Sequence, residues 1–139
     1  MSMDYSEFEG ISPYSDEEAV EALKQVARHP YTYVISKSMF PNEKLNYLST
    51  ILSNLKSVDD FQKTVMVKAV EWDLQNTFTS FTYDGVEFLK DLPNKYLLMS
   101  NHRDIILDPA LTQYVLNENG IPMSEICVGS NLLSSKTVE

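Results

Sequence analysis

The chain has 139 residues, a length that fits one domain or part of one. Hydrophobic residues make up 43% and charged residues 22%, which is typical of a globular protein with a buried core. The net charge of −9 repels phosphate backbones and anionic membrane surfaces, so we expect no nucleic-acid partner. The N-terminus lacks the basic and apolar regions of a secretory signal, and no window approaches the roughly 18 apolar residues that span a bilayer.

The first part of the chain is predicted to be a flexible arm over residues 1–14 and a helical region over residues 15–76. Ser15-Asp16-Glu17-Glu18 has the pattern of a capping box, which predicts a helix to about Arg28. Residues 31–40 are rich in aromatic and β-branched side chains and could form a strand or a short helix.

Two more helices follow in this region. The three-four spacing of leucine and isoleucine predicts an amphipathic helix over residues 42–55. Ser57 begins the next helix, which we expect to run to about Gln75. The aromatic side chains Tyr31, Tyr33, Phe40 and Tyr47 are expected in the core between these helices rather than around an acyl chain.

From residue 77 onward the pattern changes to short apolar runs separated by turn residues. We expect strands over residues 77–83, 95–99 and 126–129. Between the last two, Asp108 as N-cap and Pro109 at the first position predict a helix that stops at Gly120. Cys127, the one cysteine, stands in the last apolar run and is expected to be a buried structural thiol.

A strand, a helix and a strand within about 35 residues favour a right-handed parallel unit. The predicted fold class is therefore α/β, in which an N-terminal helical region precedes the start of a mainly parallel sheet over residues 77–139. Open sheets usually have more strands than these, so we expect the natural protein to continue beyond Glu139.

His102 carries the most informative chemistry of the sequence. It follows the expected strand over residues 95–99 and precedes a helix, which is the place where open parallel sheets bind ligands. A carboxylate beside an imidazole fixes its tautomer and stabilises the imidazolium that forms when the ring takes up a proton. Asp108 and Asp104 are the carboxylates nearest to His102 in the sequence.

The run Asn101-His102-Arg103 followed by Asp108-Pro109 resembles the first signature motif of the glycerol-3-phosphate and lysophosphatidate acyltransferase family. The resemblance covers about residues 78–133. It implies that His102 is the general base, that Asp108 orients it, and that Asn101 and Arg103 contact substrate. It further implies acyl-coenzyme A or acyl carrier protein as the acyl donor, a glycerol-phosphate or lysophospholipid acceptor, and no cofactor.

The same resemblance implies a cytoplasmic protein, peripheral to the inner face of the membrane, whose membrane contact lies in parts absent from these residues. Two features depart from the family. Five residues instead of four separate His102 from Asp108, which leaves Asp104 as a rival partner. The later phosphate-binding motifs, including a Phe-Pro-Glu-Gly-Thr block, do not occur here, so we expect this piece to be inactive alone.

Two other functions compete with acyl transfer. The chain could be a non-catalytic helical interaction module in which the His–Asp pair is incidental. A metal site built from His102, Asp104 and Asp108 is disfavoured, because three ligands in one loop rarely close such a site; we therefore expect no metal.

Overall fold

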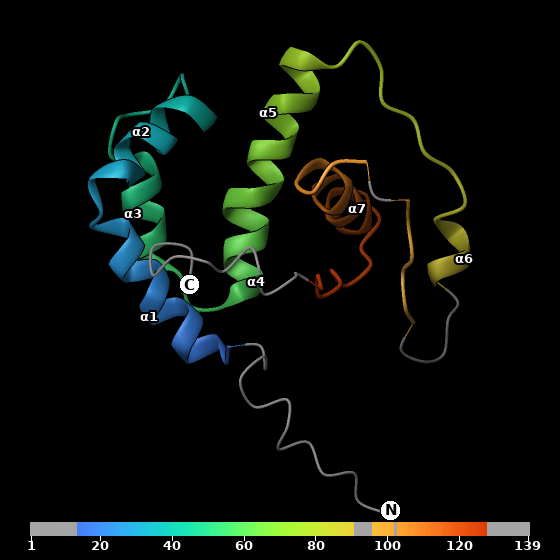
Figure 1. Ribbon diagram of the computed structural model, residues 1–139, viewed down its shortest axis with the longest axis horizontal. Helices are drawn as coiled ribbons and strands as arrows, with labels where there is room; N and C mark the ends of the chain where they lie inside the picture. The colour runs from blue at the N-terminus through green and yellow to red at the C-terminus, as the bar shows by residue number, and fades with distance from the viewer. Residues whose placement is uncertain (1–13, 91–95, 102, 128–139) are drawn as a thin grey trace, which may run out of the picture.

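The computed structural model describes residues 14–90, 96–101 and 103–127 (Figure 1). Seven α-helices and one π-helical turn follow one another along this part of the chain. Their bounds are α1 Asp16–Ala27, α2 Pro30–Met39, α3 Tyr47–Asn54, α4 Val58–Phe61, the π-turn η2 Gln62–Met66, α5 Val67–Thr77, α6 Glu87–Lys90 and α7 Leu107–Glu118.

The predicted start of α1 is confirmed. The Ser15 hydroxyl accepts the Glu18 amide at 3.3 Å, and the Glu18 carboxylate accepts the Ser15 amide at 2.9 Å. The two bonds satisfy amides that a helix start otherwise leaves without a partner. The Ser15 hydroxyl also donates to the Glu18 carboxylate at 2.7 Å. The bonds from the Ser15 amide and then from the Ser15 hydroxyl lower the pKa of Glu18 below its ordinary value, because they favour the ionised carboxylate.

Helix α2 settles the segment that the sequence left open between strand and helix. Pro30 occupies its first turn, and His29 caps it through Nδ1, which accepts the Tyr31 amide at 3.3 Å. The helix is unusual in burying Thr32 and Ser36. The Thr32 hydroxyl donates to the Val26 carbonyl, and the Ser36 hydroxyl accepts the Leu48 amide at 3.2 Å, so neither group loses hydrogen bonding on burial.

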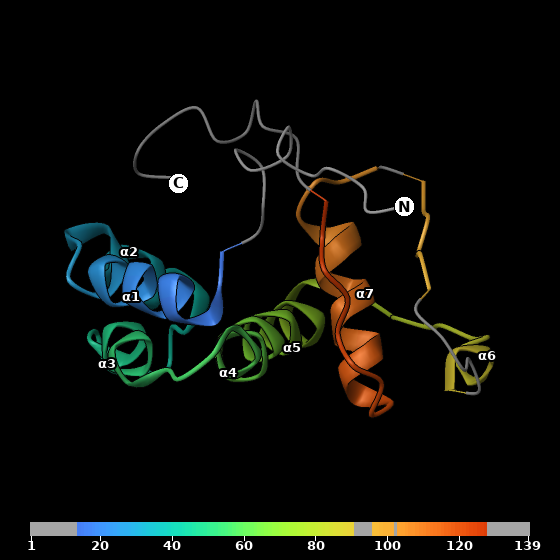
Figure 2. The same cartoon turned by 90° about the horizontal axis from the view of Figure 1, so that it is seen from below.

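The core lies among α1, α3 and the helical run from α4 to α5 (Figure 2). Its side chains are mainly aliphatic: Ala27, Phe40, Leu48, Leu52, Leu55, Val65 and Ala69. Helix α3 begins at Tyr47, five residues later than its expected start at residue 42. Ser57 starts α4 as expected, its hydroxyl accepting the Asp60 amide at 3.1 Å, and the helical run ends at Thr77.

The aromatic side chains expected in the core divide into two pairs. Phe40 is buried and meets the half-buried Tyr47 edge-on, with 5.2 Å between ring centroids. Tyr31 and Tyr33 are instead exposed, because α2 turns its small hydroxyl side chains inward.

The predicted α/β fold is wrong for the described residues, which are helical and contain no strand. Residues 78–83, which follow α5, form neither a helix nor a strand. Residues 96–100 likewise form no strand. Leu97 and Met99 are 78% and 87% exposed instead of buried. A strand needs a neighbouring strand for its amides and carbonyls, whereas a helix satisfies its own, so these segments stay unpaired.

The last predicted strand and the predicted burial of the Cys127 thiol are also wrong for the described residues. Ile126 and Cys127 are exposed, and residues 128 and 129 lie outside the described residues. Residues 121–127 run back along α7 (Figure 2), where Gln113 donates to the Ser124 carbonyl at 2.7 Å and accepts the Ser124 amide at 2.9 Å. These bonds attach the segment to a helix and not to a sheet.

Gly120 ends α7, as predicted. Its φ of +68° is a left-handed conformation that favours glycine. The turn places the Ile121 amide 2.9 Å from the Leu116 carbonyl, which satisfies a group at the helix end. In the part of the chain that the structure covers, no helix is long and apolar enough to cross a membrane.

Candidate functional site

The candidate site is the loop that leads into α7, where the sequence places Asn101, His102, Arg103, Asp104 and Asp108. His102 lies outside the described residues, so its role as general base stays a prediction. Asn101, Arg103 and Asp104 are exposed, and Asp108 is half-buried. The loop is therefore open to solvent at the residues that flank position 102.

Ile106 occupies the N-cap position of α7 and makes no side-chain cap bond, so the predicted N-cap at Asp108 is wrong. One Asp104 oxygen accepts the amides of Ile106 and Leu107, each at 2.8 Å. Asp108 falls within the first turn of the helix, and its own amide lies 3.4 Å from the Asp104 carbonyl. Aspartate side chains commonly accept amides two and three residues ahead of them, and Asp104 does so just before α7 begins.

Asp108 instead turns back onto the loop that precedes its helix. Its Oδ2 accepts the Arg103 amide at 2.7 Å and the Asp104 amide at 2.9 Å. The first of these amides belongs to the residue that directly follows position 102. The carboxylate of Asp108 is thus held next to that position, while the Asp104 carboxylate is directed toward the helix start.

A mostly apolar hollow of about 370 Å³ lies one helical turn from Asp108. Helix α7 supplies one wall, and the segment around α6 and Leu98 supplies the other. The Thr112 hydroxyl, on that α7 wall, donates to the Asp108 carbonyl at 2.8 Å. Sequence reasoning missed this hollow because its two walls come from separate stretches of chain, residues 81–98 and residues 111–116.

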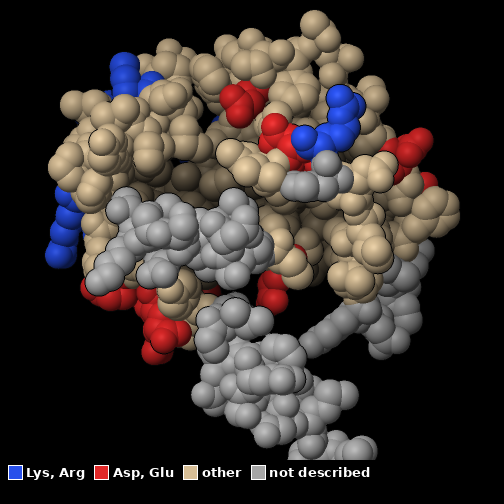
Figure 3. Space-filling view, viewed as in Figure 1, with Lys and Arg blue, Asp and Glu red and all other residues tan. Residues whose placement is uncertain are grey.

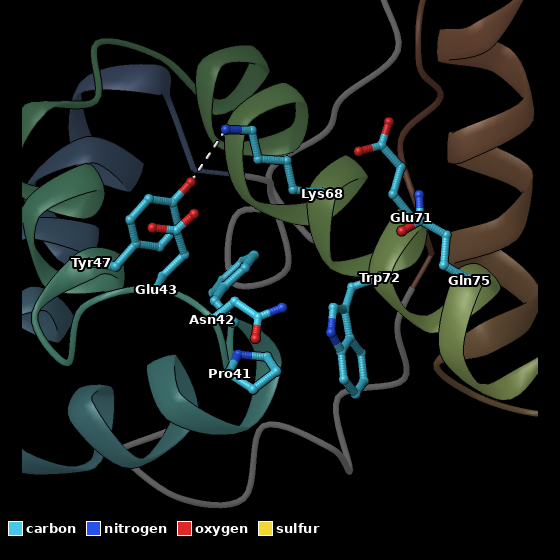
Figure 4. A pocket seen from close by; sticks show the side chains of 9 residues that line it. Pro41, Asn42, Glu43, Tyr47, Lys68, Glu71, Trp72 and Gln75 are labelled. Atoms are coloured by element: carbon cyan, nitrogen blue, oxygen red, sulfur yellow. Dashed lines mark hydrogen bonds between the residues drawn. The ribbon is translucent and has the colours of Figure 1, made fainter.

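A second hollow, of about 240 Å³, lies between the α2–α3 connection and α5 (Figure 4). Tyr47, Trp72 and Lys68 line it, together with Glu43 and Glu71. The Lys68 ammonium donates to the Tyr47 hydroxyl at 3.2 Å and stands 5.9 Å from the centre of that ring. None of the candidate site residues belongs to this hollow.

Among the described residues, which exclude His102, no three His, Cys, Asp or Glu side chains are placed to hold a metal ion. Comparisons with protein-family models, with curated proteins and with solved structures found no match.

Proposed function

We propose that the chain carries the acid–base part of a glycerolipid acyltransferase, with His102 as general base and Asp108 as the carboxylate that orients it. The observation that carries the proposal is the position of the Asp108 carboxylate, whose Oδ2 accepts the amide of the residue after His102 at 2.7 Å. The resemblance of Asn101-His102 and Asp108-Pro109 to the family motif supplies the reaction.

In the proposed reaction, His102 takes the proton of a glycerol-phosphate or lysophospholipid hydroxyl as that oxygen attacks the carbonyl carbon of an acyl thioester. The carbon–sulfur bond then breaks, and the imidazolium returns its proton to the departing thiolate of coenzyme A or acyl carrier protein. Asp108 stabilises the imidazolium between the two steps. His102 and Asp108 come from the chain, and the hydroxyl and the thioester come from the substrates, so the proposal requires no metal and no redox cofactor.

The apolar hollow beside α7 supports the proposal, because apolar side chains are the lining that an acyl chain needs. Leu111 and Val115 lie on the α7 wall, and Leu98 and Leu89 face it from the other segments. Asp108 and Val115 are seven residues apart, so the wall extends about 10 Å from the carboxylate along the helix. An alkyl chain lying there would leave its thioester at the loop. We further propose that the enzyme works at the inner face of the cytoplasmic membrane, where its lipid acceptors lie.

The test is acyl transfer by the natural full-length protein from acyl-coenzyme A to glycerol-3-phosphate and to lysophosphatidate. His102→Ala is expected to lower kcat by about 10²-fold or more, because a positioned base contributes that much. His29→Ala, at the chain's other histidine, is the matched control and should retain activity. Full activity in His102→Ala would refute the assignment of the base.

A pair of aspartate variants distinguishes the two candidate carboxylates. Asp108→Asn removes the charge beside position 102 and is expected to lower kcat at least about a hundredfold. Asp104→Asn keeps a side-chain oxygen that accepts the Ile106 and Leu107 amides, so kcat should change little. The reverse result would make Asp104 the partner of His102.

One observation favours the second candidate function, a non-catalytic interaction module. Leu97 and Met99 on one side of the loop, and Ile105 and Ile106 on the other, are all exposed. Apolar side chains gathered in this way often mark a protein interface. Absence of acyl transfer in the full-length protein, together with a stable complex that Met99→Ser and Ile106→Ser disrupt, would support this function instead.

A further inference from the structure

Helix α2 exposes apolar side chains on its outer surface. Tyr31 and Val34 are 68% and 64% exposed, and Tyr33 and Ile35 accompany them. Tyr31, Val34 and Ile35 are spaced three and four residues apart, so they share one side of the helix. We call these three side chains the α2 face, and Tyr33 lies to its flank.

The α2 face is held outward by the hydrogen bonds of the opposite side. Thr32 and Ser36 are each 1% exposed, and both bond to backbone groups of the neighbouring helices. Rotating α2 to bury Val34 would break these bonds and leave polar groups of the core without partners, which is costly. The exposure is therefore a stable property of the fold.

The stretch of chain that contains this face has a charge opposite to that of the whole protein. Residues 22–58, which include α2 and α3, contain five lysines and arginines and one acidic residue, Glu43. The remaining residues carry the other nineteen acidic side chains of a chain whose net charge is −9. In Figure 3, the upper left of the molecule, over α2, is tan and blue, whereas red side chains gather below it, toward the start of α1.

Two cations border the α2 face directly. Arg28 is the last residue before the α2 cap, and Lys37 lies one turn after Val34. The Lys37 ammonium donates to the Pro41 carbonyl at 2.6 Å, and both cations remain exposed. Exposed tyrosines, aliphatic side chains and bordering cations are the combination that binds the headgroup region of a bilayer.

We infer that the α2 face is a docking surface for an anionic lipid bilayer. Tyrosine rings suit the boundary between headgroups and acyl chains, and the cations attract anionic headgroups. A protein partner is less well matched, because a stable protein interface takes roughly 20–30 residues a side and α2 has 10. The inference stands independently of acyl transfer, since none of its residues belongs to the candidate site.

Sedimentation of the 139-residue chain with lipid vesicles tests the inference. Vesicles of phosphatidylcholine containing roughly one third phosphatidylglycerol should bind the chain, and vesicles of phosphatidylcholine alone should bind it far more weakly. Arg28→Gln and Lys37→Gln should each weaken binding about fivefold, and added salt should weaken it further. The triple variant Tyr31→Ser, Val34→Ser, Ile35→Ser should lose at least about tenfold.

Helix α6 supplies matched controls, because Phe88 is 74% exposed and Lys90 is also exposed. Phe88→Ser and Lys90→Gln should bind vesicles as tightly as the unchanged chain, and circular dichroism verifies that every variant is folded. The inference is overturned if anionic vesicles do not bind, or if the triple variant binds unchanged. It is also overturned if the unchanged chain self-associates without binding vesicles and the triple variant abolishes that self-association. His102→Ala should bind vesicles normally, so failure here is distinguishable from failure of the proposed reaction.

Discussion

The helical run from α1 to α5 and the segment after it differ in how they use apolar side chains. Ten of the twelve buried hydrophobic residues among those described lie in residues 14–77, and only Leu116 and Ile121 lie beyond them. Both regions expose large apolar side chains, the earlier one mainly on α2 and the later one on α6, on residues 97–99 and on the loop before α7, but the later region buries few. In both views α6 sits apart from the bundle (Figures 1 and 2).

The difference follows from where each kind of element finds its partners. A helix satisfies its backbone within itself and needs only one apolar stripe against a neighbour. An extended segment needs a hydrogen-bonded neighbour on at least one side, and residues 96–100 have no ladder in the described part of the chain. The first region is therefore a formed core, and the second is a set of helices and extended segments joined by a few specific bonds.

The largest test of this comparison contrasts one leucine from each region. Leu52 lies in the core and is 2% exposed, so Leu52→Ala should lower the free energy of unfolding by about 2–5 kcal/mol. Leu97→Ala should change the same quantity by less than about 0.5 kcal/mol, because the side chain is already solvated. Urea unfolding followed by circular dichroism measures both. Equal losses would mean that residues 96–100 are packed in solution.

A smaller effect is expected where α7 holds the segment that follows it. Gln113→Ala removes the hydrogen bonds to Ser124 and should destabilise the later region by about 1–3 kcal/mol, since buried polar groups lose their partner. Hydrogen exchange should speed up in residues 121–127 and in α7. The α1 amides should keep their protection from exchange. An equal loss of protection in both regions would contradict the difference drawn between them.

The capping box of α1 predicts a loss of about 1 kcal/mol for Ser15→Ala, measured by thermal unfolding. The folded-state pKa of Glu18 lies below its ordinary value of 4.5, so its contribution is present above pH 4.5 and is lost as the pH falls through the lowered pKa. Ser15→Ala should flatten that acid-side decline. An unchanged pH profile would show that the box adds nothing in solution.

The smallest effect concerns Tyr114, where α7 meets the rest of the fold. Burial first, and then the negative charges of Glu118 and Glu71, raise its pKa above the ordinary 10.0. The neutral phenol is thus favoured by folding, and this stability is present below pH 10 and lost as the pH rises through the raised pKa. Tyr114→Phe should make the alkaline loss of stability shallower. A steeper loss would reverse the assigned direction.

Local signals in the sequence predicted the helical region well. The capping box at Ser15, the cap at Ser57 and the stop at Gly120 each concern bonds between residues a few positions apart, so the pattern contains all partners of the interaction. The helix after the candidate loop was also predicted from the sequence, although Asp108 lies in its first turn and Ile106 occupies the N-cap position.

The sequence by itself determined the starts of α1 and α4 and the end of α7, because capping groups and glycine turns act over one turn of chain. Only the tertiary structure decided which apolar residues are buried. The run over residues 95–99 is apolar enough for a strand buried on both faces, but burial depends on a neighbouring element that the run does not encode. Likewise, only the tertiary structure turned Thr32 and Ser36 inward and exposed Tyr31 and Val34, because the buried hydroxyls bond to backbone groups of α1 and α3.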